Sequence, residues 1–159
     1  MTFNLDQNLI DLAKVAVAYL LALPVGWYRE KEAHSVGVRT FPMVAVAACG
    51  YILIVTGATH VSLDAQSRVL QGIVAGIGFV GAGAILKSDN HIHGTATAAS
   101  IWNIAAVGAA VAFDRYLVAA LLALLNVITL RLLLPVKQKI DSEQREDLKA
   151  SPEERVRDD

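Results

Sequence analysis

The sequence predicts an all-α membrane protein, built as a bundle of about five transmembrane helices. Of its 159 residues, 55% are hydrophobic and only 18% are charged, whereas a soluble domain carries about 25% charged residues. Residues 1–135 contain only 15 charged side chains, and these cluster between long uncharged runs. Since a helix needs about 20 apolar residues to cross the hydrocarbon core of a bilayer, such runs indicate membrane spans.

Five uncharged runs mark the helices in order. The second, third and fourth runs contain 20, 18 and 20 residues, at 40–59, 69–86 and 94–113. Each is long enough to cross a bilayer without help. The first run, 15–28, reaches that length if Asp11 and Lys14 are tolerated, and the fifth, 116–130, if Arg131 is. Long basic side chains near a helix end can extend to the interface, so both runs are also predicted to span.

Basic residues in the connecting segments predict the orientation. Arg29, Lys31, Arg39 and Lys87 follow the first and third spans, and the opposite side offers only Arg68 and Arg115. The excess of positive charge marks the cytoplasmic side. The amino terminus is therefore expected outside and the carboxyl terminus in the cytoplasm. Residues 1–136 form the predicted bundle, and 137–159 a charged cytoplasmic tail, helical or disordered.

The third span is rich in glycine. Gly72, Gly76, Gly78, Gly81 and Gly83 fall within twelve residues. The order of Gly76, Gly78 and Gly81 imitates a dinucleotide-binding fingerprint, but the strand and the acidic residue that this fingerprint requires are missing. Small residues let helix backbones approach each other in lipid. We therefore expect these glycines to pack against the fourth span at the centre of the bundle; a bent or broken helix is the alternative.

Charged residues between the first two spans have two interpretations. Arg29 and Arg39 bracket a short segment that contains Glu30 and Glu32. In the first interpretation, these charged residues anchor the helix ends at the membrane surface and set the orientation of the protein. In the second, the segment folds back over the bundle as an ion-paired cap or an anion site.

Polar residues within or beside the spans are the remaining candidates, because polar groups are costly in a bilayer. Thr97, Ser100 and Asn103 lie near one face of the fourth span and are expected to form hydrogen bonds between helices. Asp64 and Arg68, one turn apart, are expected to pair locally. Beyond Asp11 no acidic residue falls inside a predicted span, which argues against a dedicated path for Mg²⁺, an ion that prefers carboxylate oxygens.

Other classes of function lack a sequence basis. No basic surface with aromatic residues indicates nucleic-acid binding. No pairing of a nucleophile with a base, no metal-ligand cluster and no phosphate loop indicates an enzyme, so catalytic residues, metals and cofactors are not expected.

The chain resembles the MgtC/SapB family of bacterial membrane proteins. The resemblance rests on Gly26 with Arg29-Glu30, on Gly37-Val38-Arg39-Thr40, and on Arg68 followed by the glycine-rich stretch 73–85. It continues through 94–102, where Thr95 and Ala96 replace a leucine and a threonine of the family pattern. Many members carry a cytoplasmic domain after the bundle, and we expect here a short form consisting of the bundle alone.

The resemblance implies a multi-pass protein of the bacterial inner membrane, linked to growth at low magnesium and, in pathogens, to survival in host cells. Some members act on other membrane complexes, including the ATP synthase. We therefore expect a non-enzymatic regulator of membrane complexes in adaptation to low magnesium or stress, and the alternative is a transporter or channel for Mg²⁺ or another ion. The expected partners are the lipid bilayer, a second copy of the chain and such a complex. The candidate functional residues are Arg29, Glu30, Arg39, Thr40, Asp64, Arg68, Thr97 and Asn103.

Overall fold

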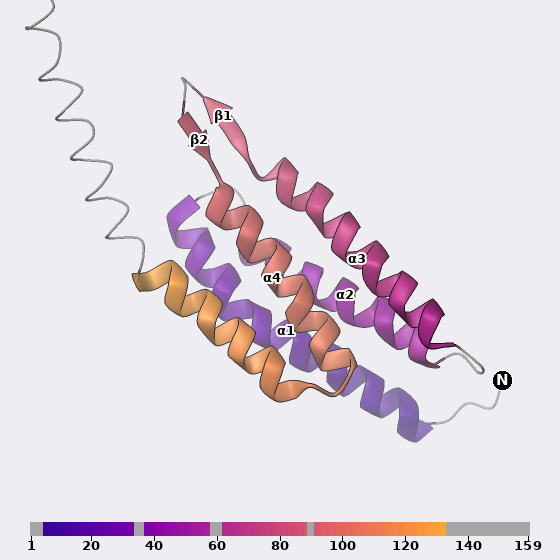
Figure 1. Ribbon diagram of the computed structural model, residues 1–159. Helices are drawn as coiled ribbons and strands as arrows, with labels where there is room; N and C mark the ends of the chain where they lie inside the picture. Colours follow the sequence, from indigo (N-terminus) through magenta and orange to yellow (C-terminus); the bar gives the residue numbers. More distant parts are fainter. Residues whose placement is uncertain (1–4, 34–36, 58–61, 89–90, 133–159) are drawn as a thin grey trace, which may run out of the picture. The chain divides into compact units, whose positions relative to one another are not determined.

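The computed structural model of the protein describes residues 5–33, 37–57, 62–88 and 91–132 and contains five helices in this part of the chain (Figure 1). They are α1 (Leu5–Ala33), α2 (Thr40–Gly57), α3 (Leu63–Gly83), α4 (Thr95–Ala112) and a fifth helix, Tyr116–Leu132. Two short antiparallel strands, β1 (Leu86–Ser88) and β2 (His91–His93), connect α3 to α4. The predicted all-α architecture is confirmed, and the β-hairpin is a feature that the sequence did not predict.

Three of the five helices are long and apolar enough to cross a membrane. These are residues Leu5–Lys31 of α1, all of α2 and all of α4. The fifth helix is apolar but has only 17 residues. Helix α3 has 21 residues, but glycines and the polar side chains of its first turns dilute its hydrophobicity. The prediction of five helices therefore holds, while α3 and the fifth helix have weaker span character than the other three.

The chain divides into two compact units, Met1–Val127 and Ile128–Asp159. All contacts discussed below lie within the first unit. The predicted tail, 137–159, and the boundary before it lie outside the described residues.

The core of the first unit lies where α4 meets α1 and α2. Gly108 of α4 lies directly against the backbone of Ala45 in α2, which leaves no room for a side chain. Around this contact the largest fully buried side chains come from α1, α2 and α4: Val25, Phe41, Ile52, Ile101, Ile104, Val107 and Val111. A glycine at the crossing lets two apolar helices approach closely, and large side chains fill the space on either side.

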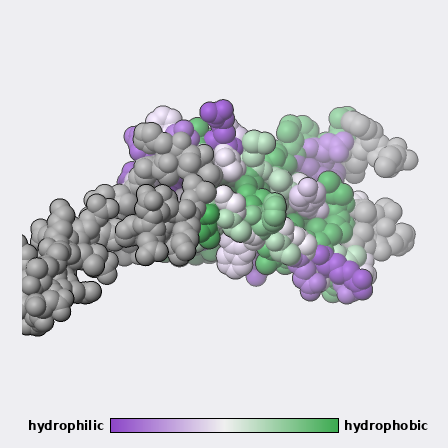
Figure 2. All heavy atoms as spheres, turned by 90° about the horizontal axis from the view of Figure 1, so that it is seen from above, coloured by the Kyte–Doolittle hydropathy of each residue, from purple (hydrophilic) through white to green (hydrophobic). Residues whose placement is uncertain are grey.

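Apolar side chains also cover much of the outside of this unit. Leu20, Ile54 and Phe79 are 61%, 74% and 84% exposed. Figure 2 shows hydrophobic residues gathered around the middle of the visible face, with hydrophilic residues towards its ends. An apolar surface of this extent would be unfavourable in water, and it is what a bilayer requires.

Candidate functional site

A buried arginine connects the end of α1 to the start of α4. The side chain of Arg29 is almost fully buried, and its Nη2 donates a hydrogen bond to the buried hydroxyl oxygen of Thr97. A charged group inside a bundle requires such hydrogen bonds, because burial otherwise costs several kcal/mol. The structure thus brings together two candidate residues that lie 68 positions apart in the sequence.

The loop after α1 folds back onto the same end of the bundle. Glu30 Oε2 accepts a hydrogen bond of 3.0 Å from the backbone N–H of Val38, and Gly37 lies against the Glu30 side chain so closely that a Cβ would overlap it. Gly26 approaches the Cα of Val38, where an added Cβ would lie 3.1 Å away. Two of the motifs that carry the family resemblance, Gly26 with Arg29-Glu30 and 37–40, therefore form one structural unit, the α1–α2 hairpin.

The remaining candidates of this region lie at its surface. Arg39 is exposed, and Thr40 begins α2 as a half-buried residue. The carboxylate of Glu30 accepts a hydrogen bond from a backbone N–H and so closes the loop after α1.

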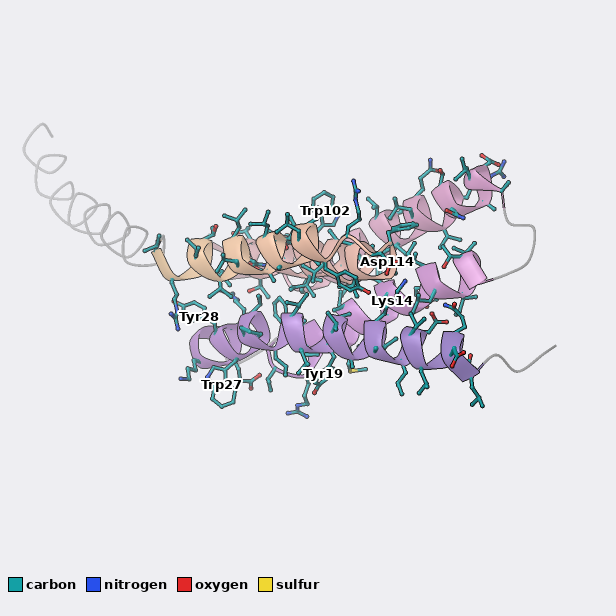
Figure 3. All side chains as sticks on the ribbon, turned by 90° about the horizontal axis from the view of Figure 1, so that it is seen from below. Lys14, Tyr19, Trp27, Tyr28, Trp102 and Asp114 are labelled. Atoms are coloured by element: carbon teal, nitrogen blue, oxygen red, sulfur yellow. The ribbon has the colours of Figure 1, made fainter. Side chains whose placement is uncertain are left out.

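At the opposite end of the bundle a second polar contact links α1 to the turn after α4. Lys14 Nζ, with only 9% of the side chain exposed, lies 2.8 Å from Asp114 Oδ2 and donates a 3.2 Å hydrogen bond to the carbonyl oxygen of Ala112. Asp114 adopts φ 59°, a left-handed conformation that aspartate tolerates better than most residues. Figure 3 shows the two side chains pointing toward one another.

The electrostatics of this contact follow from its geometry. The hydrogen bond from Lys14 holds the pKa of Asp114 below its ordinary value of 3.8. The ammonium also lies at the carboxyl end of α4, where a cation stabilises the last carbonyl groups. Asp11, which lies one turn before Lys14 in α1, is not its partner. The structure instead pairs Asp11 with Gln7, at 3.0 Å. The sequence shows a lysine inside an apolar run, which indicates that this lysine needs a partner. It does not identify that partner.

A cavity of about 480 Å³ opens beside this ion pair. It is lined by side chains of α1, the end of α2 and the turn after α4, including Gln7, Asp11, Lys14, Thr56 and Asp114. Among the described residues no three histidine, cysteine or acidic side chains lie close enough to hold a metal ion. Any cation in this cavity would depend on the two carboxylates.

Of the three polar residues of α4 that were expected to form hydrogen bonds between helices, Thr97 and Ser100 do so. Ser100 donates a 3.0 Å hydrogen bond to Asn126 Oδ1 on the fifth helix, and Asn126 Nδ2 returns one of 3.4 Å to the Ser100 carbonyl. The prediction that α4 forms hydrogen bonds between helices is thus confirmed for Thr97 and Ser100. Asn103 Oδ1, in contrast, is a buried atom that accepts no hydrogen bond from the part of the chain described.

At the start of α3, Asp64 and Arg68 form the predicted local pair, with N···O distances of 3.0 Å. Both side chains are more than two thirds exposed, so the pair contributes little to stability.

The predicted central packing of the glycine-rich helix is wrong for four of its five glycines. An added Cβ at Gly72, Gly76, Gly78 or Gly83 would meet nothing within 4 Å, and only Gly81 contacts α4, at Ala98. Gly81 is also the only buried residue of α3. The helix is continuous, so it is not broken either. It lies at the edge of the bundle and touches α4 along one side (Figure 1).

Two of the open glycines, Gly72 and Gly76, line a groove between α2 and α3. The groove has a volume of about 430 Å³ and is almost entirely apolar, with Ala47 and Tyr51 on α2 and Val69, Gly72, Gly76 and Val80 on α3. We call the surface formed by Gly72, Gly76 and Gly83 the glycine face of α3.

Comparison with known proteins identifies the family. The model of the MgtC family matches residues 15–139, which include all of the described bundle except the start of α1. The chain belongs to the MgtC family. It is therefore a membrane protein of that family, as the apolar helices and the two motifs of the α1–α2 hairpin indicated.

Several curated proteins are similar to this chain. Protein SrpB of Synechococcus elongatus is 32% identical over 110 residues, which are 62% of this chain and 60% of SrpB. Protein MgtC of Brucella abortus is 40% identical over 97 residues, 60% of this chain and 40% of that protein. YhiD of Escherichia coli, proposed by its name to be a magnesium transporter, is 30% identical over 112 residues, 66% of this chain and 52% of YhiD. The chain thus spans less than two thirds of these relatives, and no solved structure matches it.

Proposed function

We propose that this protein is a non-enzymatic regulator of the bacterial inner membrane that binds another membrane protein through the glycine face of α3. The proposal includes a multi-pass arrangement with the amino terminus outside and the carboxyl terminus in the cytoplasm, as the basic residues of the connecting segments favour. Adaptation to low magnesium or stress is the setting that the family resemblance implies, with the ATP synthase as one complex of the expected kind.

The observation that carries this proposal is the uncompensated glycine content of α3. Each glycine in a helix costs about 1 kcal/mol relative to alanine. At Gly26 and Gly108 the close approach of another backbone explains the residue, whereas Gly72, Gly76, Gly78 and Gly83 have open space beside them. In lipid, glycines four residues apart favour close contact between helices, which would compensate for the cost. Gly72 and Gly76 have this spacing and face a groove.

Co-purification from native membranes tests the proposal, by comparing the wild-type protein with Gly76→Leu. A Cβ added at residue 76 meets nothing within 4 Å, and the groove of about 430 Å³ has room for the rest of the leucine side chain, so we expect the variant to keep its thermal stability and lose its partner. The matched control is Gly78→Leu, the same substitution at an open glycine of α3 that does not line the groove, and it should retain the partner. A wild-type protein that co-purifies with nothing, or a Gly76→Leu variant that retains every partner, contradicts the proposal.

A second candidate function is ion transport, favoured by the polar cavity beside Lys14 and by the proposal in the name of YhiD. Asp11 and Asp114 supply the oxygen ligands that a hydrated Mg²⁺ would use there. Against it, the polar side chains at Thr97, Ser100 and Asn126 bond to other side chains of the bundle. Mg²⁺ flux into liposomes distinguishes the two functions. A regulator produces no flux, while a saturable flux abolished by Asp11→Asn and Asp114→Asn would establish transport.

A further inference from the structure

The exposed face of α4 carries two polar groups at the middle of a candidate membrane span. Trp102 is 56% exposed and points away from α1 and α2 (Figure 3). Asn103 follows it as a half-buried residue. Both lie halfway along α4, a helix long enough to cross the membrane. At this depth there is no water to bind an indole N–H or an amide.

The position of Trp102 is unusual for a membrane tryptophan. Tryptophans gather at the interfaces of the bilayer, where the ring nitrogen reaches water. Trp27 follows this rule: it lies in the last turns of α1, with Lys31 Nζ 5.4 Å from its ring centre. Trp102 forms no hydrogen bond with any residue in the part of the chain that the structure describes. Its N–H is therefore a donor without an acceptor in the hydrocarbon region.

Asn103 supplies the complementary half of a hydrogen bond. Its Oδ1 is buried and accepts no hydrogen bond from the described residues. Because no described residue donates a hydrogen bond to this oxygen, turning the amide about its broad χ2 torsion would break no such bond; it would place the oxygen at the surface and the amide nitrogen inside. One donor and one acceptor thus lie next to each other on one helix, each lacking a partner.

Helix geometry determines which surface could satisfy both groups. Residues of an α-helix follow each other at 3.6 per turn, which places Ala99 and Ala106 between Trp102 and Asn103 around the helix. Both alanines are exposed. Their small side chains would let a second helix approach closely along this line.

We propose that this face of α4 is the interface of a homodimer, in which Trp102 Nε1–H of each copy donates to Asn103 Oδ1 of the other. In a two-fold dimer with both α4 helices running in the same direction, the side chains to the left of the contact line face those to the right in the other copy. Trp102 of one copy therefore faces Asn103 of the other, displaced by one residue along the helix axis. Because of the two-fold symmetry, the same hydrogen bond occurs twice. Ala99 and Ala106 meet their own counterparts at the axis.

The surroundings of this face provide space for the second copy. A groove of about 290 Å³ continues along α4 from Trp102, with Ala105, Ala106, Ala109 and Ala110 at its base and apolar residues of α3 and the fifth helix on its sides. The homodimer interface is separate from the glycine face of α3, so it does not depend on the proposed regulatory partner.

Energy transfer between labelled copies in lipid vesicles, measured while the protein is diluted with lipid, tests the homodimer. Two hydrogen bonds between helices in lipid correspond to about a tenfold change in the dissociation constant. We expect Trp102→Phe and Asn103→Leu each to weaken the dimer about tenfold. Their double variant should be no weaker than either single one, because both remove the same bonds. Trp27→Phe, on another face, is the matched control and should leave the dimer unchanged.

Disulfide cross-linking in membranes locates the contact independently of its strength. In a Cys49→Ala background, Ala99→Cys at the two-fold axis should form covalent dimers, whereas Ile54→Cys, which is 74% exposed on α2, should not. A monomeric wild-type protein in vesicles overturns the proposal. So do unchanged dimerisation of Trp102→Phe, additive effects in the double variant, or equal cross-linking at residues 99 and 54.

Discussion

Helices α4 and α3 contain neighbouring parts of the sequence and differ sharply in their contacts. Ten residues of α4 are buried, and its Gly108 lies against the backbone of α2. In α3 only Gly81 is buried, although this helix has the higher glycine content. Glycine therefore has two different structural roles in this protein. In α4 it allows contact within the chain, and in α3 it leaves a surface that the described chain does not fill.

The largest expected effect concerns this difference between glycines. Gly108→Leu would drive a side chain into the backbone of Ala45, and we expect it to destabilise the bundle by about 3 kcal/mol or more, or to prevent folding. A Cβ added at Gly78 meets nothing within 4 Å, and leucine removes the helical cost of glycine, so Gly78→Leu should leave the stability unchanged or raise it by up to about 1 kcal/mol. Thermal unfolding in detergent checks both. Equal destabilisation by the two variants would remove the distinction between the helices.

The buried contact between α1 and α4 should have the next largest effect. Thr97→Val keeps the shape of the side chain but removes an acceptor from the Arg29 guanidinium, so we expect a loss of roughly 1–3 kcal/mol. Thr95→Val, at an exposed position two residues earlier, is the control and should be nearly neutral. Denaturant titration of both variants in mixed micelles provides the measurement. A Thr97→Val variant as stable as the wild type would show that the contact does not hold the helices together.

The ion pair at the other end of the bundle predicts a dependence on pH. The pKa of Asp114 is lowered in the folded protein, so the stability that the pair contributes is complete above the ordinary value of 3.8 and decreases as the pH falls through the lower, folded-state pKa. Asp114→Asn tolerates the left-handed backbone and should remove this part of the acid sensitivity, with a loss of at most about 1 kcal/mol at neutral pH. Unfolding temperatures between pH 7 and 3 test this. An identical acid profile in the variant would assign the sensitivity to other groups.

The smallest effect is expected at the exposed pair on α3. Arg68→Ala removes the bond to Asp64, and because both side chains are largely exposed the stability should change by less than about 0.5 kcal/mol. If Arg68→Ala lost a membrane partner while keeping its stability, the result would show that the binding surface of α3 includes its first turns. The same co-purification that compares Gly76→Leu with the wild type provides this measurement.

The fold was largely predictable because length and apolar composition determine helices in a membrane. The five uncharged runs correspond to the five helices, and the local pair of Asp64 with Arg68 follows from helical spacing alone. Contacts across the bundle were less accessible. The partner of Lys14 is 100 residues away, in a turn whose conformation no periodicity specifies, and Asn126 lies in a run that was interpreted only as apolar.

The glycine-rich helix shows why composition could not decide the packing. Small residues indicate that a backbone can be approached closely, but they do not specify which helix approaches it. The sequence offered α4 as the nearest alanine-rich neighbour, and only Gly81 meets it. Gly26 and Gly108 are the glycines of α1 and α4 at which another backbone approaches closely. Each is the only glycine of its helix, so no spacing of glycines marked these contacts in the sequence.

Site-specific photo-cross-linking in native membranes tests the central claim, that α3 binds another membrane protein, most directly. A photoreactive side chain at Val80, which lines the groove between α2 and α3, is compared with one at Leu124, which is 54% exposed on the fifth helix. We predict a discrete cross-link to a different membrane protein from residue 80, absent from residue 124 and lost in Gly76→Leu. Cross-links to lipid alone from both positions would contradict the claim.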